Sequence, residues 1–316
     1  MILKAPSVKQ MAMFMLIMLP SMTGYMAWEA RAVEVTVLDI DGAPEGVVFI
    51  TDPHVRASNI DHVQDVIREV NRLNPTVVLI GGDFVTGDES DFKSQAVWRS
   101  LDAPTYAILG NHDYRVGIDG PTGIERTLAT RASAMVTAEE YDVSGLNDGS
   151  ADVAFADALT ETLEENGVHV LRNDYARISA GGKEMVIVGL DDGWAGMADP
   201  PDVPATDAFT VYLIHEPSCR ADWDADLILA GHTHGGQFLF PVVAQLNGLG
   251  IVELAGLFAP DGKTPTYISR GICSASFAGV DLRFNCRPEI VLINPTEEQL
   301  RTLNGSANTI RVTRTT

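Results

Sequence analysis

Five short apolar runs, each followed directly by polar residues, constrain the fold of this chain more than any other feature of its sequence. Continuous Val, Ile and Leu runs of this length are typical of strands that are buried on both faces of a sheet. The runs are GVVFITDPH at 46–54, TVVLIGGDF at 76–84, TYAILGNHD at 105–113, FTVYLIHEP at 209–217 and DLILAGHTH at 226–234. Between the first two, apolar residues recur at helical spacing from Ile60 to Leu73, and Pro75 ends that pattern. The strand–helix–strand order predicts a layered α/β fold.

The second half of the chain adds further elements of the same kinds. A helix is expected from Phe155 to about Gly167, followed by a strand. Three more strands are expected in KEMVIVGLDDG at 183–193, PTYISRG at 265–271 and PEIVLINP at 288–295, of which the last is taken as the final strand.

Two segments do not fit this pattern. Residues 114–154 are rich in Gly, Asp, Ser and Thr and have weak periodicity. Because long irregular connections are usually functional or disordered, this segment is predicted to be an insertion that forms a lid over a site. The polar tail at 296–316 is expected to be partly loose.

The N-terminus carries an uncharged apolar stretch, residues 11–28, which follows two lysines. About eighteen apolar residues is the lower limit for a membrane-spanning helix, and Pro20 and Gly24 weaken the stretch as a helix. The ARA sequence at 30–32 resembles a signal-peptide cleavage site. Residues 1–32 are therefore interpreted as a signal peptide or a membrane anchor, with a buried helix as the alternative. Either of the first two interpretations predicts an extracytoplasmic location, periplasmic or secreted, for the rest of the chain.

Charge and cysteine content exclude several classes of protein. Acidic residues outnumber basic ones by 43 to 22, which gives a net charge of −21 and disfavours binding to nucleic acid. An anionic substrate would need local positive charge, such as metal ions. The cysteines, Cys219, Cys273 and Cys286, form no C-x-x-C pair, so buried and unpaired thiols are expected.

Polar side chains gather at the ends of the five apolar runs, and they include five of the seven histidines. They are Asp52, His54, Asp83, Asn111, His112, Asp113, His215, His232 and His234. Several strand ends that meet at one edge of a sheet are the usual place for a site in an α/β fold. Carboxylate, amide and imidazole ligands without thiolates suit manganese, iron or zinc and argue against a structural zinc site.

The spacing within two of these groups has a physical reason. In an extended chain residues i and i+2 point to the same side, so Asp52 and His54 are expected to reach one ion together. In the turn GHTH, His232 and His234 can address two neighbouring ions. Glycines at 231, 235 and 236 remove side chains where the backbone bends or approaches a ligand closely.

The blocks DPH, GGD, GNHD, H and GHTHGGQ, in this order between Asp52 and Gln237, resemble the motifs of the calcineurin-like metallophosphoesterase superfamily. Residues 267–293, YISRGICSASFAGVDLRFNCRPEIVLI, are similar to the C-terminal part of its membrane-associated bacterial branch, which also tends to carry an N-terminal hydrophobic segment. The resemblance covers residues 33–295. It implies one phosphoesterase domain with two mixed β-sheets packed as a sandwich between flanking helices, the α/β/β/α four-layer fold.

The resemblance also implies roles for individual residues. Two divalent ions are expected, with a bridging hydroxide that attacks phosphorus while His112 protonates the leaving oxygen. The ligands would be Asp52, His54 and His234 for the first ion, Asn111, His215 and His232 for the second, and Asp83 for both. Asp113 is expected as the carboxylate partner of His112. Arg56 is either a contact to substrate phosphate or a solvated surface arginine.

These features together predict an enzyme that hydrolyses a phosphodiester or pyrophosphate bond. A lipid-linked or envelope substrate is favoured by the expected location and by the apolar FLFPVV at 238–243, which either lines a groove for a lipid tail or fills the core. The alternative is a non-catalytic metal-binding scaffold on the same fold. His112 favours the enzyme, because every expected ligand could bind metal without it.

Overall fold

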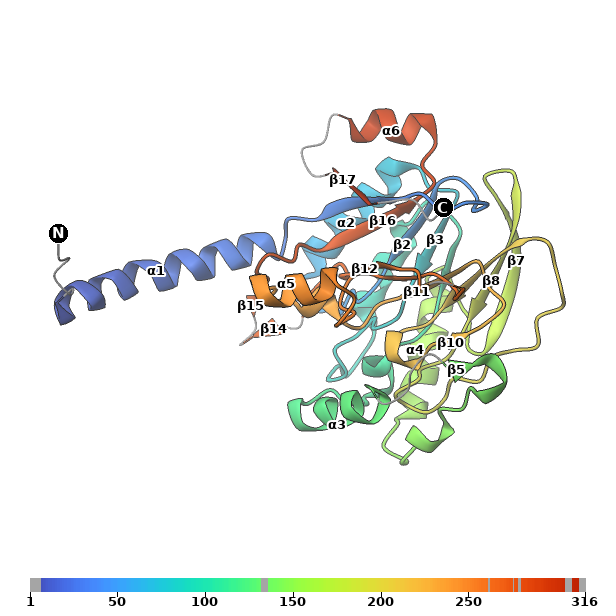
Figure 1. Cartoon of the computed structure of the whole chain (residues 1–316), viewed down its shortest axis with the longest axis horizontal. Helices are drawn as coiled ribbons and strands as arrows, with labels where there is room; N and C mark the ends of the chain where they lie inside the picture. The colour runs from blue at the N-terminus through green and yellow to red at the C-terminus, as the bar shows by residue number, and fades with distance from the viewer. Residues whose placement is uncertain are drawn as a thin grey trace.

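The computed structural model describes residues 7–131, 136–260, 262–274, 276–277, 280–304 and 309–312. Two large mixed sheets lie at its centre, with helices outside them (Figure 1). The first sheet has the order β17 (Thr309–Val312), β1 (Glu34–Leu38), β16 (Glu289–Ile293), β2 (Val47–Ile50), β3 (Val77–Ile80), β4 (Thr105–Ala107) and β6 (Val168–Val170). The second has the order β12 (Gly256–Phe258), β13 (Thr266–Ile268), β11 (Leu227–Ala230), β9 (Phe209–Leu213), β8 (Lys183–Gly189) and β7 (Asp174–Ala180). The expected fold class is confirmed.

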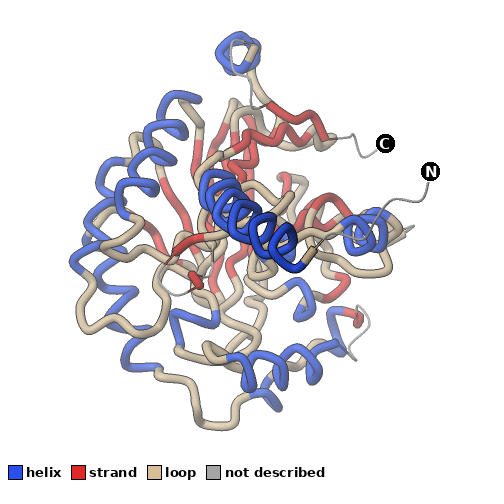
Figure 2. The backbone as a smooth tube through the Cα atoms, turned by 90° about the vertical axis from the view of Figure 1, so that its left-hand side faces the viewer, coloured by secondary structure: helices blue, strands red, loops and turns tan. Residues whose placement is uncertain are grey.

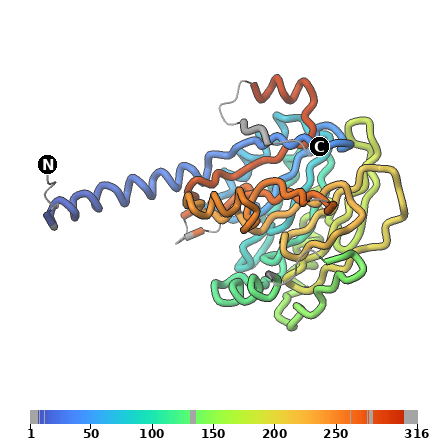
Figure 3. Tube along the Cα trace, in the orientation of Figure 1, coloured from blue at the N-terminus to red at the C-terminus, as the bar shows by residue number. Residues whose placement is uncertain are grey.

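Strand directions explain why polar loops meet at one edge of the sheets. β2, β3 and β4 are parallel neighbours in the first sheet, and β8, β9 and β11 are parallel neighbours in the second. The first strand of the chain lies beside the last two in the first sheet, where β1 pairs with both β16 and β17; the blue trace of β1 runs next to the red trace of β16 (Figure 3).

Three apolar layers hold the sheets and helices together. Between the sheets, Phe49 and Leu79 of the first pack in one cluster with Leu213 and Leu229 of the second. On the outer face of the first sheet lie α2 (Ile60–Leu73), α4 (Val153–Glu165) and the 3₁₀ helix η1 (Lys93–Ser100). The apolar face of α2 is buried, as its helical spacing predicts. On the outer face of the second sheet, Trp223 stacks on Tyr212.

Truncating a leucine between the sheets should lower stability far more than truncating one at the surface. Leu229 is fully buried in the cluster between the sheets, so Leu229→Ala should lower the free energy of unfolding by about 2–5 kcal/mol. Leu249, which is 73% exposed, is the matched control. Leu249→Ala should change the free energy of unfolding by less than about 0.5 kcal/mol. Denaturant unfolding of both variants in the same detergent measures this; equal losses would contradict the assignment of the core.

The N-terminal segment forms one helix, α1 (Val8–Glu29), which projects away from the sheets (Figure 1). It continues through Pro20, so the expected weakness at that residue does not break it. Residues 9–29 are long and apolar enough to span a membrane, and the apolar window within them is 0% buried. A buried helix of the domain is therefore contradicted, while signal peptide and membrane anchor both stay open.

Two further expectations need correction. The segment 114–154 is not irregular throughout, since it contains α3 (Gly120–Arg131) and β5 (Val136–Thr137), which pairs with β10 (Ala221–Asp222). The tail contains α6 (Glu297–Leu303) and strand β17, so the strand at 289–293 is not the last. A reciprocal capping box between Thr296 and Gln299 starts α6. All three cysteines are free and buried, as predicted.

Candidate metal centre

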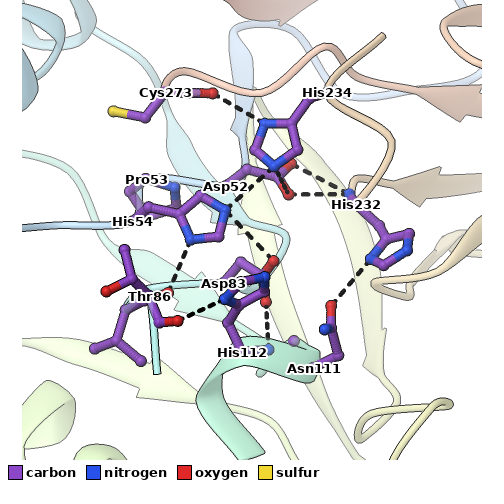
Figure 4. Close-up of polar contacts among 12 residues, drawn as sticks. Asp52, Pro53, His54, Asp83, Thr86, Asn111, His112, His232, His234 and Cys273 are labelled. Atoms are coloured by element: carbon purple, nitrogen blue, oxygen red, sulfur yellow. Dashed lines mark hydrogen bonds and ion pairs between the residues drawn. The ribbon is translucent and has the colours of Figure 1, made fainter. Parts of the chain in front are cut away.

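The polar residues of the five blocks meet at one edge of the two sheets (Figure 4). They lie in the loops that directly follow β2, β3, β4, β9 and β11. Within the described part of the chain, three groups have ligand atoms within 4.8 Å of one another: Asp52, His54 and His234; His54, Asp83 and His112; and Asp83, His215 and His232. Because Asp83 and His54 each occur in two groups, the three groups form one continuous cluster.

Five residues of this cluster have a backbone in the left-handed region, although none of the five is glycine. Positive φ angles occur at Asp52 (54°), His54 (39°), Asp83 (58°), His232 (69°) and His234 (49°). Each such residue costs on the order of 1–3 kcal/mol, and such strain typically gathers at functional sites. Asp52 and His54 therefore lie together as predicted, but the chain between them is not extended, as their i, i+2 spacing had suggested. β2 ends at Ile50, and backbone hydrogen bonds from Asp52 N to Gly82 O (3.1 Å) and from His54 N to Asp83 O (2.9 Å) hold the loop instead.

The rings of His54 and His234 point the lone pairs of their Nε2 atoms toward each other. Nδ1 of His54 lies 2.8 Å from Val85 O and Nδ1 of His234 lies 3.0 Å from Cys273 O, so both Nδ1 atoms donate. Burial lowers the pKa of His54 to about 3 and that of His234 to about 4, so both rings are neutral near pH 7. Their unprotonated Nε2 atoms are 3.2 Å apart, and Nε2 of His234 is 3.6 Å from Asp52 Oδ1. These acceptors repel one another unless a cation lies between them, so this donor set fits a divalent metal ion.

The pair formed by His215 and Asp83 also needs a positive charge between its two facing atoms. Nδ1 of His215 donates to Gly81 O at 2.7 Å, which turns Nε2 toward Asp83 Oδ2 at 3.1 Å. Burial opposes protonation of His215, but the Asp83 carboxylate outweighs it and raises the pKa of His215 well above its usual value. Burial would likewise raise the pKa of Asp83, but His215 and His112 outweigh it and hold that pKa well below its usual range. A proton or a metal ion must therefore lie between these two atoms.

Asn111 and His232 complete the second group. The amide Nδ2 of Asn111 donates to Val116 O at 2.6 Å, which leaves Oδ1 3.0 Å from Nδ1 of His232. Burial lowers the pKa of His232 well below its usual value, so the ring is neutral. An amide oxygen and an imidazole nitrogen at this separation are suitable ligands for one ion.

His112 belongs to the cluster through its group with His54 and Asp83, but Asp113 does not support it. The backbone N–H of His112 donates to Asp83 Oδ1 at 2.9 Å, and its Nδ1 donates to Thr86 O at 2.7 Å. The fully buried carboxylate of Asp113 instead accepts hydrogen bonds from Gly110 N at 2.9 Å and Val85 N at 3.2 Å. Asp113 therefore caps the short helix η2 (Asn111–Tyr114). The carbonyl of Thr86, and not the Asp113 carboxylate, accepts the hydrogen bond from the His112 ring. This corrects the predicted partner of His112.

Arg56 is held by protein groups. Its guanidinium forms an ion pair with Asp281 and donates to Ser58 Oγ at 3.1 Å. The side chain is only 16% exposed, so the solvated alternative does not describe it. Contact with a substrate phosphate would require it to share or leave the ion pair with Asp281, and that role stays a prediction.

Two glycines make room for the carboxylates of the cluster. A Cβ at Gly231 would overlap Thr51 Oγ1 and lie 2.8 Å from Asp52 Oδ2, which gives a steric reason for the glycine in GHTH. A Cβ at Gly110 would overlap Asp83 Oδ1 and lie 2.8 Å from His215 Cε1. Because Gly110 has an extended backbone that any residue adopts, only space excludes a side chain there.

Gly110→Ala should therefore weaken metal binding by displacing Asp83. Changes that displace a ligand indirectly typically lower metal affinity about 10–100-fold, and that range is expected here. Titration of the metal-free protein with Mn²⁺ or Zn²⁺ measures the change. Gly145→Ala is the matched control, because a Cβ at Gly145 would meet no atom within 4 Å. Equal affinities in the two variants would show that Gly110 is not needed for space.

A cleft of about 720 Å³ opens beside the cluster. His232 and Trp194 line it, together with Thr127 and Thr130 of α3 and the loop 250–254. The Trp194 ring packs against His232 with ring centres 4.2 Å apart at 70°. Sequence reasoning missed Trp194, and its only signal was a large aromatic residue directly after the strand-end sequence GLDDG.

A two-sheet α/β fold with buried carboxylates and imidazoles converging at the sheet edge defines a metal-dependent hydrolase. Residues 46–236 match the family described as Calcineurin-like phosphoesterase, and the chain belongs to that family. It is accordingly a hydrolase that acts on phosphoester bonds, and divalent metal ions are its implied cofactors.

Relatives cover most of the chain. It is 29% identical over 265 residues to the phosphodiesterase YaeI of Escherichia coli, covering 80% of this chain and 83% of YaeI. It is 30% identical over 282 residues to the UDP-2,3-diacylglucosamine pyrophosphatase LpxG of Chlamydia trachomatis, covering 78% of this chain and 82% of LpxG. Among solved structures, TT1561 of Thermus thermophilus is 10% identical with a TM-score of 0.37, covering 73% of this chain and 91% of that protein.

Proposed function

We propose that this protein is a dinuclear metal-dependent phosphoesterase that hydrolyses a phosphodiester or pyrophosphate bond in a lipid-linked substrate outside the cytoplasm. The observation that carries the proposal is the position of Asp83. Its Oδ2 atom lies 3.5 Å from Nε2 of His54, in the first group, and 3.1 Å from Nε2 of His215, in the second. A carboxylate in contact with an imidazole from each group of donors is suited to bridge two cations.

The proposed ligand sets follow the two groups of donors. Asp52, His54 and His234 would hold one ion, Asn111, His215 and His232 the other, and Asp83 both. When bound, two such ions polarise a phosphoryl oxygen and make a nucleophile available near neutral pH. The identity of the metal, whether manganese, iron or zinc, is open, because the donors suit all three.

His112 is the proposed general acid. Its Nδ1–H is fixed by the carbonyl of Thr86, so Nε2 is the atom that would carry a proton to the leaving oxygen. The half-buried ring lies edge-on to His54 with centres 4.7 Å apart, which places it next to the donors without making it a required ligand.

The cleft and the relatives support the proposed substrate class. The cleft joins the ligand His232 to the apolar side chains Ile251 and Leu254, an arrangement suited to a phosphate with an apolar substituent. The printed activities of LpxG and YaeI, a pyrophosphatase of a diacylated nucleotide sugar and a phosphodiesterase, agree with such a substrate.

The chain organisation is part of the proposal. Residues 1–32 would be the anchor or signal, 33–295 the catalytic domain and 296–316 a polar C-terminal tail, whose described parts include α6 and β17. Residues 114–154 would act as a lid, because α3 within them lines the cleft through Thr127 and Thr130.

Metal analysis and activity profiling of the reconstituted protein test this function. We expect two divalent ions per chain, with faster hydrolysis of phospholipid-like diesters than of phosphomonoesters or nucleotides. Chelation followed by readdition of metal should abolish and restore activity. Tightly bound metal without hydrolysis of any phosphoester would contradict the proposal and favour a metal-binding scaffold.

A further inference from the structure

An uncharged apolar segment lies at the surface beside the cleft. Residues 238–252, FLFPVVAQLNGLGIV, contain no charged residue, although about one residue in five of the whole chain is charged (21%). The segment includes α5 (Pro241–Gly248), none of whose residues is buried. Val242 and Leu249 are 62% and 73% exposed. FLFPVV therefore does not fill the core, and the apolar surface that it presents is left in contact with solvent.

This segment is continuous with the base of α1. The Phe240 ring lies 5.6 Å from Phe284, Phe284 lies 6.2 Å from Tyr25, and Tyr25 lies 5.8 Å from Trp28. The Glu29 carboxylate fixes the same loop by accepting hydrogen bonds from the backbone N–H groups of residues 285 and 286 at 3.0 and 2.9 Å. Tyrosine and tryptophan at the end of a membrane helix mark the level of the membrane–water interface. The start of α5 lies at that level.

Helix α3, which lines the cleft through Thr127 and Thr130, carries a second apolar stripe at the surface. Ile124 and Leu128 of α3 are both 63% exposed and, being four residues apart, share one face of the helix. Thr127, which lies between them on that helix, lines the cleft. α3 and α5 both lie on the side from which α1 projects, which faces the reader in Figure 2.

We propose that the segment 238–252 and the α3 stripe rest in the headgroup region of the bilayer crossed by α1, so that the cleft beside His232 opens at the level of lipid phosphates. The proposal deepens the proposed function by naming the bilayer surface as the partner of the same site. The net charge of −21 does not favour electrostatic attraction to anionic lipid, so apolar side chains must provide this contact. Substrate would then reach the metal ligands without leaving the membrane.

Depth-dependent fluorescence in bilayers tests the contact directly. The full chain carrying Leu249→Cys is labelled with an environment-sensitive fluorophore and placed, one chain per disc, in phosphatidylcholine nanodiscs that contain nitroxide-labelled lipid. Because the native cysteines are buried, labelling is selective for the new residue. Glu184→Cys is the control, since Glu184 is exposed on β8, far from α1 (Figure 1). Val242→Cys provides a second position on the same segment.

We expect lipid-borne nitroxide to quench labels at positions 249 and 242 several-fold more than at 184. Quenching no greater than at 184 would overturn the proposal. A blue-shifted but unquenched label would also overturn it, because a protein surface and not lipid would then cover the segment. This readout needs no turnover, so it decides the contact even if the proposed enzymatic activity fails.

A kinetic comparison adds an independent test. The double variant Val242→Asp with Leu249→Asp should hydrolyse a diester embedded in phosphatidylcholine at least about tenfold more slowly than the wild type, because charged side chains resist transfer from water into the apolar part of the interface. Hydrolysis of a water-soluble diester should be unchanged, since neither residue lines the cleft. Unchanged rates on both substrates, or equal losses on both, would count against membrane contact.

Discussion

Asp83→Asn should remove most of the metal affinity and nearly all of the hydrolytic activity. The substitution keeps the shape of the side chain and an oxygen that can still accept the hydrogen bond from His112 N, so the loop after β3 should stay in place. It removes the one charge shared by the two groups of donors. Removing one partner of a buried charge interaction costs about 3–5 kcal/mol, which corresponds to a loss of roughly 10²–10⁴-fold in affinity. Isothermal titration with Mn²⁺ and the hydrolysis rate at saturating metal measure the two effects.

An exposed aspartate provides the control for this experiment. Asp65 pairs with Arg68 on α2, and its side chain is 65% exposed, so Asp65→Asn should leave both metal affinity and rate unchanged. The proposed bridging role would be contradicted if Asp83→Asn bound two ions with wild-type affinity. Loss of both ions at once is the expected signature of a shared ligand, whereas loss of one alone would limit Asp83 to a single group.

His112→Gln should slow hydrolysis while leaving the bound metal intact. A glutamine cannot deliver a proton, so the rate with a poor leaving group, such as an alkyl diester, should fall on the order of 10²–10⁴-fold. The rate with a p-nitrophenyl diester should fall much less, because that leaving group departs without a proton. Metal content should equal that of the wild type, since two of the three groups of donors, Asp52 with His54 and His234 and Asp83 with His215 and His232, do not include His112.

The comparison of leaving groups separates acid catalysis from metal binding. His234→Gln is the matched control, because His234 belongs to the group with Asp52 and His54. Its rate loss should be similar for both leaving groups and should accompany loss of metal. If His112→Gln lowered both rates equally, or released metal, His112 would act as a ligand or a structural residue and not as the acid.

The convergence of the site was predictable because it depends on strand order. β2, β3 and β4 are parallel neighbours, so residues that follow their ends meet at one edge of the sheet. Short Val- and Ile-rich runs therefore place Asp52, Asp83 and Asn111 together before any coordinates are known. The amphipathic pattern of α2 was predictable for a related reason, since one buried face sets its spacing.

The features of the site that the sequence could not predict depend on the conformation of the backbone. The left-handed conformation of Asp52 and the carbonyls of Val85 and Thr86 that orient the imidazoles are set by tertiary hydrogen bonds, which carry no side-chain pattern. Asp113 was misassigned because adjacency in GNHD suggests a contact with His112, while the turn of η2 directs its carboxylate to backbone N–H groups. Strand β17 was missed because four residues within a polar tail give too short a signal.

The central claim is that residues from five loops hold two cations around one carboxylate. An anomalous difference map from a crystal of the manganese-reconstituted protein tests it most directly. The claim predicts two peaks about 3.5–4 Å apart with Asp83 in contact with both. A single peak, or two peaks of which only one contacts Asp83, would contradict it.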